Sequence, residues 1–209
     1  MPAAIVFDFN GTLSDDEPVL CEIFSQLFAE HGKPLAAQQY FDHLAGLSDP
    51  EIVRTWLGRD HPEVDEVIEE RIRRYRAAVG DGSTVHEHVR EAVRYAAARV
   101  PLAICSGAAQ AEIRPVIEAA GIADCFRAVV SSDDVERGKP DPEGYRVALA
   151  ALGVHDALAF EDTEAGVASA RAAGLRVIAK RGTLDPARLT AADELVDRID
   201  VELMRRCLS

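Results

Sequence analysis

Four short stretches of the chain carry polar side chains whose combination suits chemistry on a phosphate group. They are Asp8-Phe9-Asn10-Gly11-Thr12, Ser106-Gly107, Gly138-Lys139-Pro140-Asp141-Pro142 and Glu161-Asp162-Thr163. Carboxylate oxygens are ligands that Mg²⁺ prefers, while a hydroxyl and an ammonium group suit phosphoryl oxygens. Brought together by the fold, the four stretches would form a site for a magnesium ion beside a phosphate.

Each stretch taken alone has an ordinary structural explanation. Asp8 could close an Asx-turn, Ser106 could cap a helix, and Lys139 could be an exposed loop cation. Glu161-Asp162 could cap the helix that begins nearby. What favours a functional site is the joint occurrence of all four along a series of predicted strand ends.

The elements that would position these residues alternate between strands and helices over most of the chain. Short apolar runs predict strands, and the longer stretches between them predict helices. The strands are Ala3–Phe9, Pro101–Cys105, Ala128–Ser131, Ala157–Phe160, Arg176–Ala179 and a weak one at Glu194–Val196; the helices are Val85–Arg99, Ala109–Ala120, Glu143–Leu152 and Ala165–Ala173. Such alternation predicts right-handed βα units and a parallel sheet.

A different pattern follows the first strand. Four helices with no strand between them are predicted at Glu17–His31, Ala36–Leu44, Pro50–Leu57 and Pro62–Val79. One strand cannot bury itself alone, so the first strand must join the later sheet, and the four helices become an insertion. The predicted fold class is α/β: a doubly wound, Rossmann-like core domain (residues 1–14 and 82–209) with a small inserted helical cap domain (15–81).

The predicted sheet places the polar stretches at one edge. In open parallel sheets, ligands bind beyond the carboxyl ends of the strands, near the point where the strand order reverses. The polar stretches follow the first, second and fourth strands or lie in the loop between the third and the fourth. We therefore expect the carboxylates, the hydroxyl and the ammonium group to converge.

Composition limits the other possibilities. The net charge of −13 argues against a nucleic-acid or anionic-membrane partner. No apolar run approaches the roughly 20 residues that cross a bilayer, and the first residues lack the pattern of a signal peptide, so a cytoplasmic location is expected. Four scattered cysteines without metal-binding spacing predict reduced thiols rather than a zinc site or disulfides. The charged residues of the last inserted helix are expected to form a solvated face: Glu66, Glu69, Glu70, Arg71, Arg73 and Arg74.

The motifs resemble those of the haloacid dehalogenase (HAD)-like hydrolase superfamily, in its branch with a helical cap after the first strand. The resemblance rests on Asp8-Phe9-Asn10-Gly11-Thr12-Leu13, Ser106-Gly107, Gly138-Lys139-Pro140-Asp141-Pro142 and Glu161-Asp162-Thr163-Glu164-Ala165-Gly166, and it spans nearly the whole chain. It is closest to the phosphoglycolate phosphatase and β-phosphoglucomutase-like group. It implies a Mg²⁺-dependent hydrolase that cleaves a small phosphorylated metabolite.

The resemblance also assigns the metal and the nucleophile. Asp8 would attack phosphorus and carry a transient aspartyl phosphate. Asp8, the main-chain carbonyl of Asn10, and Asp162 would hold Mg²⁺, with Glu161 as a further or indirect ligand. The metal would offset the repulsion between Asp8 and the anionic substrate.

The same resemblance assigns the phosphate-binding residues. Ser106 and the amide of Gly107 would bind phosphoryl oxygens. Lys139 would neutralise charge on the nucleophile and on the transferring group, and Thr12 would help to position the phosphate-binding loop. The oligomeric state is open between a monomer and a homodimer.

Asn10 departs from the pattern of the group. Most of its phosphatases and mutases have an aspartate there, which protonates the leaving oxygen and later activates water. Asn10 cannot exchange a proton in this way, and such catalysis contributes about 10²–10⁴-fold. The expected enzyme is therefore slow on alkyl phosphates or selective for good leaving groups; the alternative is a catalytically impaired sensor that binds phosphate ligands.

Residues of the predicted cap bear on the other activities of the superfamily. Asp49 stands where β-phosphoglucomutases have an arginine for a second phosphate, which argues against a mutase. A phosphonate hydrolase would need a cap lysine for a Schiff base, and the only one, Lys33, is expected at the surface. Dehalogenases of the superfamily need no metal and lack the Glu-Asp pair that Glu161-Asp162 supplies here, which argues against a dehalogenase. Arg54 and Arg59 could contact an anionic substrate, although exposure is the simpler expectation.

Overall fold

A single parallel sheet forms the centre of the protein. The structure, a computed structural model, describes residues 1–209. The strands are β1 (Ile5–Phe7), β2 (Leu102–Cys105), β3 (Ala128–Val130), β4 (Leu158–Glu161), β5 (Arg176–Lys180) and β6 (Glu194–Val196). Their order, β3-β2-β1-β4-β5-β6, is that of a doubly wound, Rossmann-like sheet. The predicted fold class is confirmed.

The strand order reverses at β1, which pairs with both β2 and β4. Phe7 is in register with Ile104 of β2 and with Phe160 of β4. The next residue, Asp8, is therefore level with Cys105 and Glu161 on its two neighbours. The three motifs that begin at Asp8, Ser106 and Glu161 therefore start side by side at the carboxyl edge of the sheet.

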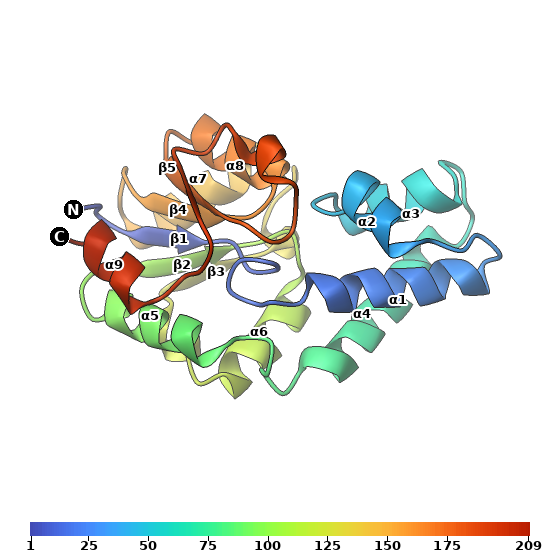
Figure 1. The fold of residues 1–209 in the computed structure, drawn as a ribbon, viewed down its shortest axis with the longest axis horizontal. Coiled ribbons are helices and arrows are strands. Elements are labelled where there is room, and N and C mark those ends of the chain that lie inside the picture. The colour runs from blue at the N-terminus through green and yellow to red at the C-terminus, as the bar shows by residue number, and fades with distance from the viewer.

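Helices cover both faces of the sheet, because successive strand side chains point to opposite sides. Ala4 and Val6 pack in one apolar cluster, with α7 (Glu143–Leu152) and α8 (Glu164–Ala172), while Ile5 and Phe7 pack in the other. Three helices lie over the second face: α5 (Glu87–Ala97), α6 (Gln110–Ala119) and α9 (Val201–Cys207). Figure 1 shows the two helical layers with the sheet between them.

Helix α9 was not predicted from the sequence, although a start signal is present. The Asp200 side chain accepts a hydrogen bond of 2.9 Å from the main-chain amide of Leu203 and so caps the helix. Leu203 and Met204 are buried in the larger apolar cluster. Short 3₁₀ turns also occur at Ala123–Cys125, Ser132–Asp134 and Pro186–Leu189.

The remaining helices form a separate layer, which we call the helical unit. It comprises α1 (Glu17–Glu30), α2 (Ala37–His43), α3 (Asp49–Leu57) and α4 (Val64–Val79). Figure 1 shows it at one end of the molecule, past the carboxyl ends of the strands. Helix α1 packs against α4, and α4 packs against α6 of the sheet layer. No helix of the protein combines the length and the apolar character that a membrane crossing demands. All four cysteines are free thiols; Cys21 and Cys105 are buried, whereas Cys125 and Cys207 are partly exposed.

The prediction that the charged residues of α4 form a solvated face is wrong for Arg71. This residue is only 5% exposed, and its guanidinium pairs with Asp49 of α3 and with Glu112 of α6. The helical period places Arg71 on the same stripe as Val67 and Tyr75, which face the core. Arg71 therefore ties the helical unit to the sheet layer.

Candidate active site

Three of the predicted site residues meet in one buried ion cluster. Lys139, from the loop between β3 and α7, donates to Asp8 Oδ1 at 2.6 Å and to Glu161 Oε1 at 2.5 Å. Tyr145 of α7 donates to the same Glu161 oxygen at 2.6 Å. Asp8 is 7% exposed and Glu161 is fully buried. A single ammonium group thus bridges two carboxylates from neighbouring strands.

Asp162, the residue after β4, lies beside this cluster. It is fully buried, and its carboxylate accepts hydrogen bonds from the hydroxyls of Thr12, at 3.1 Å, and Thr183. The Thr12 side chain is therefore committed to Asp162. Gly11 has φ +71°, and a Cβ there would lie 1.9 Å from Asp162 Oδ2, so the loop after β1 requires glycine.

Burial dominates the electrostatics of these groups. It raises the pKa of Asp8 to about 7, although the Lys139 ammonium acts in the opposite direction. Burial, with the charges of Asp8 and Glu161, also raises the pKa of Asp162 well above its usual range. Burial opposes the charge of Lys139, but the two carboxylates outweigh it and raise the pKa of the ammonium. Three carboxyl groups therefore share a single ammonium as their only cation.

The donor set fits a divalent cation. Asp8, Glu161 and Asp162 each offer a carboxylate oxygen, and these oxygens lie within 4.8 Å of one another. Hard oxygen donors are those that Mg²⁺ prefers, and a divalent cation would supply the positive charge that favours the ionised form of all three carboxyl groups.

The predicted phosphate-binding residues lie at the end of the adjacent strand β2. Ser106 is 6% exposed, and its Oγ accepts a hydrogen bond of 3.1 Å from the amide of Ala108. Gly107 is exposed, and its main-chain amide donates to no group of the protein. A free amide and a hydroxyl next to the Asp8 strand are suitable donors for phosphoryl oxygens.

The Asn10 side chain is bound by two residues that sequence reasoning did not select. Its Nδ2 donates to Asp16 Oδ2 at 3.0 Å and to the Tyr75 hydroxyl at 3.2 Å. Asp16 is close to the first motif and could have been found by its position. Tyr75 lies 65 residues further along the chain, on α4, and no local signal marks it.

Glu17, the first residue of α1, is also buried near these groups. The Tyr40 hydroxyl donates to its Oε2 at 3.1 Å. Burial raises the pKa of Glu17 to about 8, and the charge of Asp16 adds to the effect. The sequence alone did not reveal this burial.

Other charged residues considered from the sequence lie away from the cluster or are already paired. Lys33 is exposed and donates to the main-chain oxygen of Leu57 at 2.6 Å. Arg54 and Arg59 are exposed, with no ion pair. Asp49 pairs with Arg71 rather than standing free.

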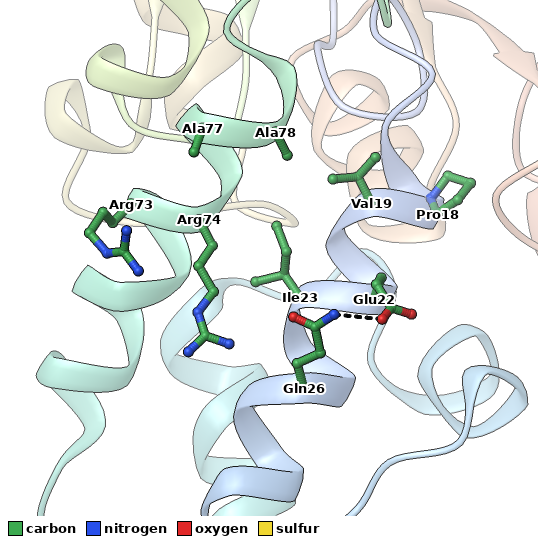
Figure 2. Close-up of a pocket in the computed structure, with 9 residues that line it drawn as sticks. All are labelled: Pro18, Val19, Glu22, Ile23, Gln26, Arg73, Arg74, Ala77 and Ala78. Atoms are coloured by element: carbon green, nitrogen blue, oxygen red, sulfur yellow. Dashed lines mark hydrogen bonds between the residues drawn. The ribbon is translucent and has the colours of Figure 1, made fainter.

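The surface groove of about 570 Å³ between α1 and α4 is not the candidate site (Figure 2). It is lined by Pro18, Val19, Glu22, Ile23, Gln26, Arg73, Arg74, Ala77 and Ala78. Figure 2 shows Glu22 bonded to Gln26 across one helix face, and Arg74 is held by Glu30 and Glu70. None of the clustered carboxylates lines this groove, so the candidate site is the cluster at the strand ends.

The chain is similar to known proteins over most of its length. The family model of haloacid dehalogenase-like hydrolases matches residues 5–180. The validoxylamine A 7′-phosphate phosphatase of Streptomyces hygroscopicus subsp. limoneus is 28% identical, over 91% of both chains. A phosphoglycolate phosphatase of Rhodospirillum rubrum is 31% identical over 85% of this chain and 79% of that protein.

A solved structure gives the same result for the fold. The crystal structure of CbbY from Rhodobacter sphaeroides in complex with phosphate has a TM-score of 0.84 and 25% identity, covering 97% of this chain and 96% of that chain. The predicted relationship and the predicted enzyme class are both confirmed. The chain belongs to the haloacid dehalogenase-like hydrolase family.

Proposed function

We propose that the protein is a Mg²⁺-dependent phosphatase that hydrolyses a small phosphorylated metabolite through an aspartyl phosphate on Asp8. The observation that carries the proposal is the buried cluster in which Lys139 bridges Asp8 and Glu161, with Asp162 beside them. The phosphatase names of the relatives support the same reaction class.

The residues divide the work of phosphoryl transfer. Asp8 attacks phosphorus, and Lys139 stabilises the charge shared by the nucleophile and the transferring group. Ser106 and the Gly107 amide hold phosphoryl oxygens. The carboxylates of Asp8, Asp162 and Glu161, with the main-chain carbonyl of Asn10, would hold the metal. When bound, Mg²⁺ supplies positive charge that offsets repulsion between the nucleophile and the anionic substrate.

We assign residues 15–81 to a cap that selects the substrate, over a catalytic core of residues 1–14 and 82–209. Two close approaches support this assignment. A Cβ at Gly46, in the loop between α2 and α3, would lie 3.0 Å from Thr163 Cγ2, next to Asp162. Arg188 of the core donates to the main-chain oxygen of Phe41 at 3.5 Å. A cytoplasmic location and a monomer or homodimer stay predictions.

An aryl phosphate assay tests the proposal directly. With Mg²⁺ present we expect turnover, and EDTA should abolish it until Mg²⁺ is restored. Asp8→Asn should reduce turnover to background because the nucleophile is lost. Asp60→Asn, which changes an exposed aspartate of the helical unit, is the matched control and should retain activity.

Turnover that survives both EDTA and Asp8→Asn would contradict the mechanism. Binding of inorganic phosphate without turnover of any phosphate ester would favour the sensor instead.

A further inference from the structure

Asn10, Asp16 and Tyr75 form a closed hydrogen-bonded triangle at the boundary between the strand ends and the helical unit. Asn10 Nδ2 contacts Asp16 Oδ2 at 3.0 Å and the Tyr75 hydroxyl at 3.2 Å. The Tyr75 hydroxyl in turn donates to Asp16 Oδ2 at 2.5 Å. The other oxygen, Asp16 Oδ1, accepts the main-chain amide of Gly11 at 3.2 Å. Asp16 is fully buried.

The triangle fixes which end of the Asn10 amide is available. A carboxylate only accepts hydrogen bonds, so the amide must turn its NH₂ group toward Asp16. Tyr75 donates its one proton to Asp16 and therefore accepts from the same NH₂ group. No group of the protein donates to Asn10 Oδ1, and the residue is partly exposed. The side chain can offer a ligand an acceptor but no donor.

We propose that Asp16 is a positioning residue that holds the Asn10 amide with only its carbonyl oxygen available, which limits the enzyme to phosphates whose leaving group departs without a proton. Acyl, enol and aryl phosphates meet this requirement, whereas alkyl phosphates do not. This inference rests on the proposed phosphatase function and names the substrate class of the same site.

The two chemical steps balance without a protein acid. In the first, an Asp8 oxygen bonds to phosphorus while the bond from phosphorus to the leaving oxygen breaks, and the leaving group keeps the electron pair as a carboxylate, enolate or phenolate. In the second, water bonds to phosphorus and the Asp8 oxygen leaves as a carboxylate. Both protons of the water stay on the inorganic phosphate, which leaves as H₂PO₄⁻, and the Asn10 carbonyl oxygen can accept a hydrogen bond from the entering water.

A series of leaving groups tests the wild-type protein. We would measure kcat/KM with Mg²⁺ on acetyl phosphate, p-nitrophenyl phosphate, phenyl phosphate and glycerol 3-phosphate. We expect a steep fall as the leaving group becomes more basic, by about 10²-fold or more between the aryl and alkyl esters, since that is the typical contribution of the missing acid. Comparable values for aryl and alkyl esters would overturn the inference.

An exchange variant tests the role of Asp16. Asn10→Asp alone places a second carboxylate about 3 Å from Asp16, where repulsion favours a proton held between the two and away from the substrate. The exchange Asn10→Asp/Asp16→Asn removes this conflict at unchanged net charge. We expect it to raise kcat/KM on glycerol 3-phosphate by about 10²-fold and to narrow the gap between aryl and alkyl esters accordingly.

The matched control is Asn10→Asp/Asp15→Asn, because Asp15 is exposed and lies outside the triangle. It should behave as Asn10→Asp alone. Equal gains for the exchange, the control and the single variant would show that Asp16 has no positioning role. Should the exchange variant fail to fold, the wild-type series still decides the substrate class.

The outcomes separate this inference from the proposed function. If kcat/KM is similar for all four leaving groups and turnover is still abolished by EDTA, only the role of Asp16 and Asn10 is overturned. Loss of turnover on all four substrates overturns the phosphatase function itself.

Discussion

Replacing Glu17 by glutamine should make the folded protein more stable at alkaline pH than the wild type. Glu17 is 8% exposed, and burial raises its pKa from 4.5 to about 8. The neighbouring charges are those of Asp16 and Asp8, which act in the same direction, and of Arg71, which opposes them. The Tyr40 hydroxyl binds one carboxyl oxygen, and a glutamine oxygen can accept the same bond.

The sign follows from the protonation of the two states. Below pH 4.5, Glu17 is protonated in the folded and the unfolded chain, so its ionisation has no effect on stability. As the pH rises toward about 8, the unfolded chain loses the proton while the folded protein keeps it, and unfolding becomes more favourable. The difference between the two pKa values corresponds to about 5 kcal/mol in full. Between pH 5 and pH 8 we expect the advantage of Glu17→Gln to grow by about 3–4 kcal/mol.

Urea unfolding at pH 5, 6, 7 and 8 measures this advantage. EDTA should be present throughout, because a cation bound near Asp8 would stabilise the folded state and alter the charge around Glu17. Glu22→Gln is the control, since Glu22 is exposed on the same helix. Stability curves for wild type and Glu17→Gln that stay parallel across this range would refute the assignment of a neutral buried acid.

Two further predictions concern packing and charge around the site. Gly166→Ala places a Cβ 1.9 Å from Glu161 Oε2, so it should cost about 1–3 kcal/mol in urea unfolding. Gly138→Ala, with nothing within 4 Å, should cost less than about 1 kcal/mol. Arg71→Met leaves the carboxylates of Asp49 and Glu112 without their cation and should lower the free energy of unfolding by about 3–5 kcal/mol. The exposed Arg73→Met should lower it by less than about 0.5 kcal/mol. Equal losses within either pair would contradict the corresponding packing or charge argument.

The sheet and the meeting of polar residues at its carboxyl edge could be predicted because local signals and topology agree. Apolar runs such as that around Ile5–Phe7 mark buried strands, and in a parallel sheet their carboxyl ends share one edge. This rule alone places Asp8, Ser106 and Asp162 together. The same rule, extended past β5, would also have found Lys180, which donates to the main-chain oxygen of Gly11 at 2.7 Å, and Thr183.

The contacts between the helical unit and the strand ends could not be predicted in this way. The helical period of α4 shows that Tyr75 faces inward, but not that its hydroxyl meets Asp16. Arg71 has the sequence neighbours of an exposed residue, and its burial depends on Glu112, 41 residues away. Such partners are fixed by how two helices pack, and one sequence contains no record of that geometry.

The buried carboxylates near the strand ends show why residue type alone does not assign a role. Asp8 lies against the Lys139 ammonium, which favours its ionised form and suits the nucleophile that we propose. Asp16 is surrounded by donors and orients a neighbour. Glu17 has one hydroxyl partner and no bonded cation, so burial keeps its proton. Asp162 accepts hydrogen bonds from two hydroxyls and lies with Asp8 and Glu161 in a group of carboxylates that could hold a metal ion. Each role follows from what surrounds the carboxyl group, and a change to a shared partner such as Lys139, which binds both Asp8 and Glu161, should alter more than one group.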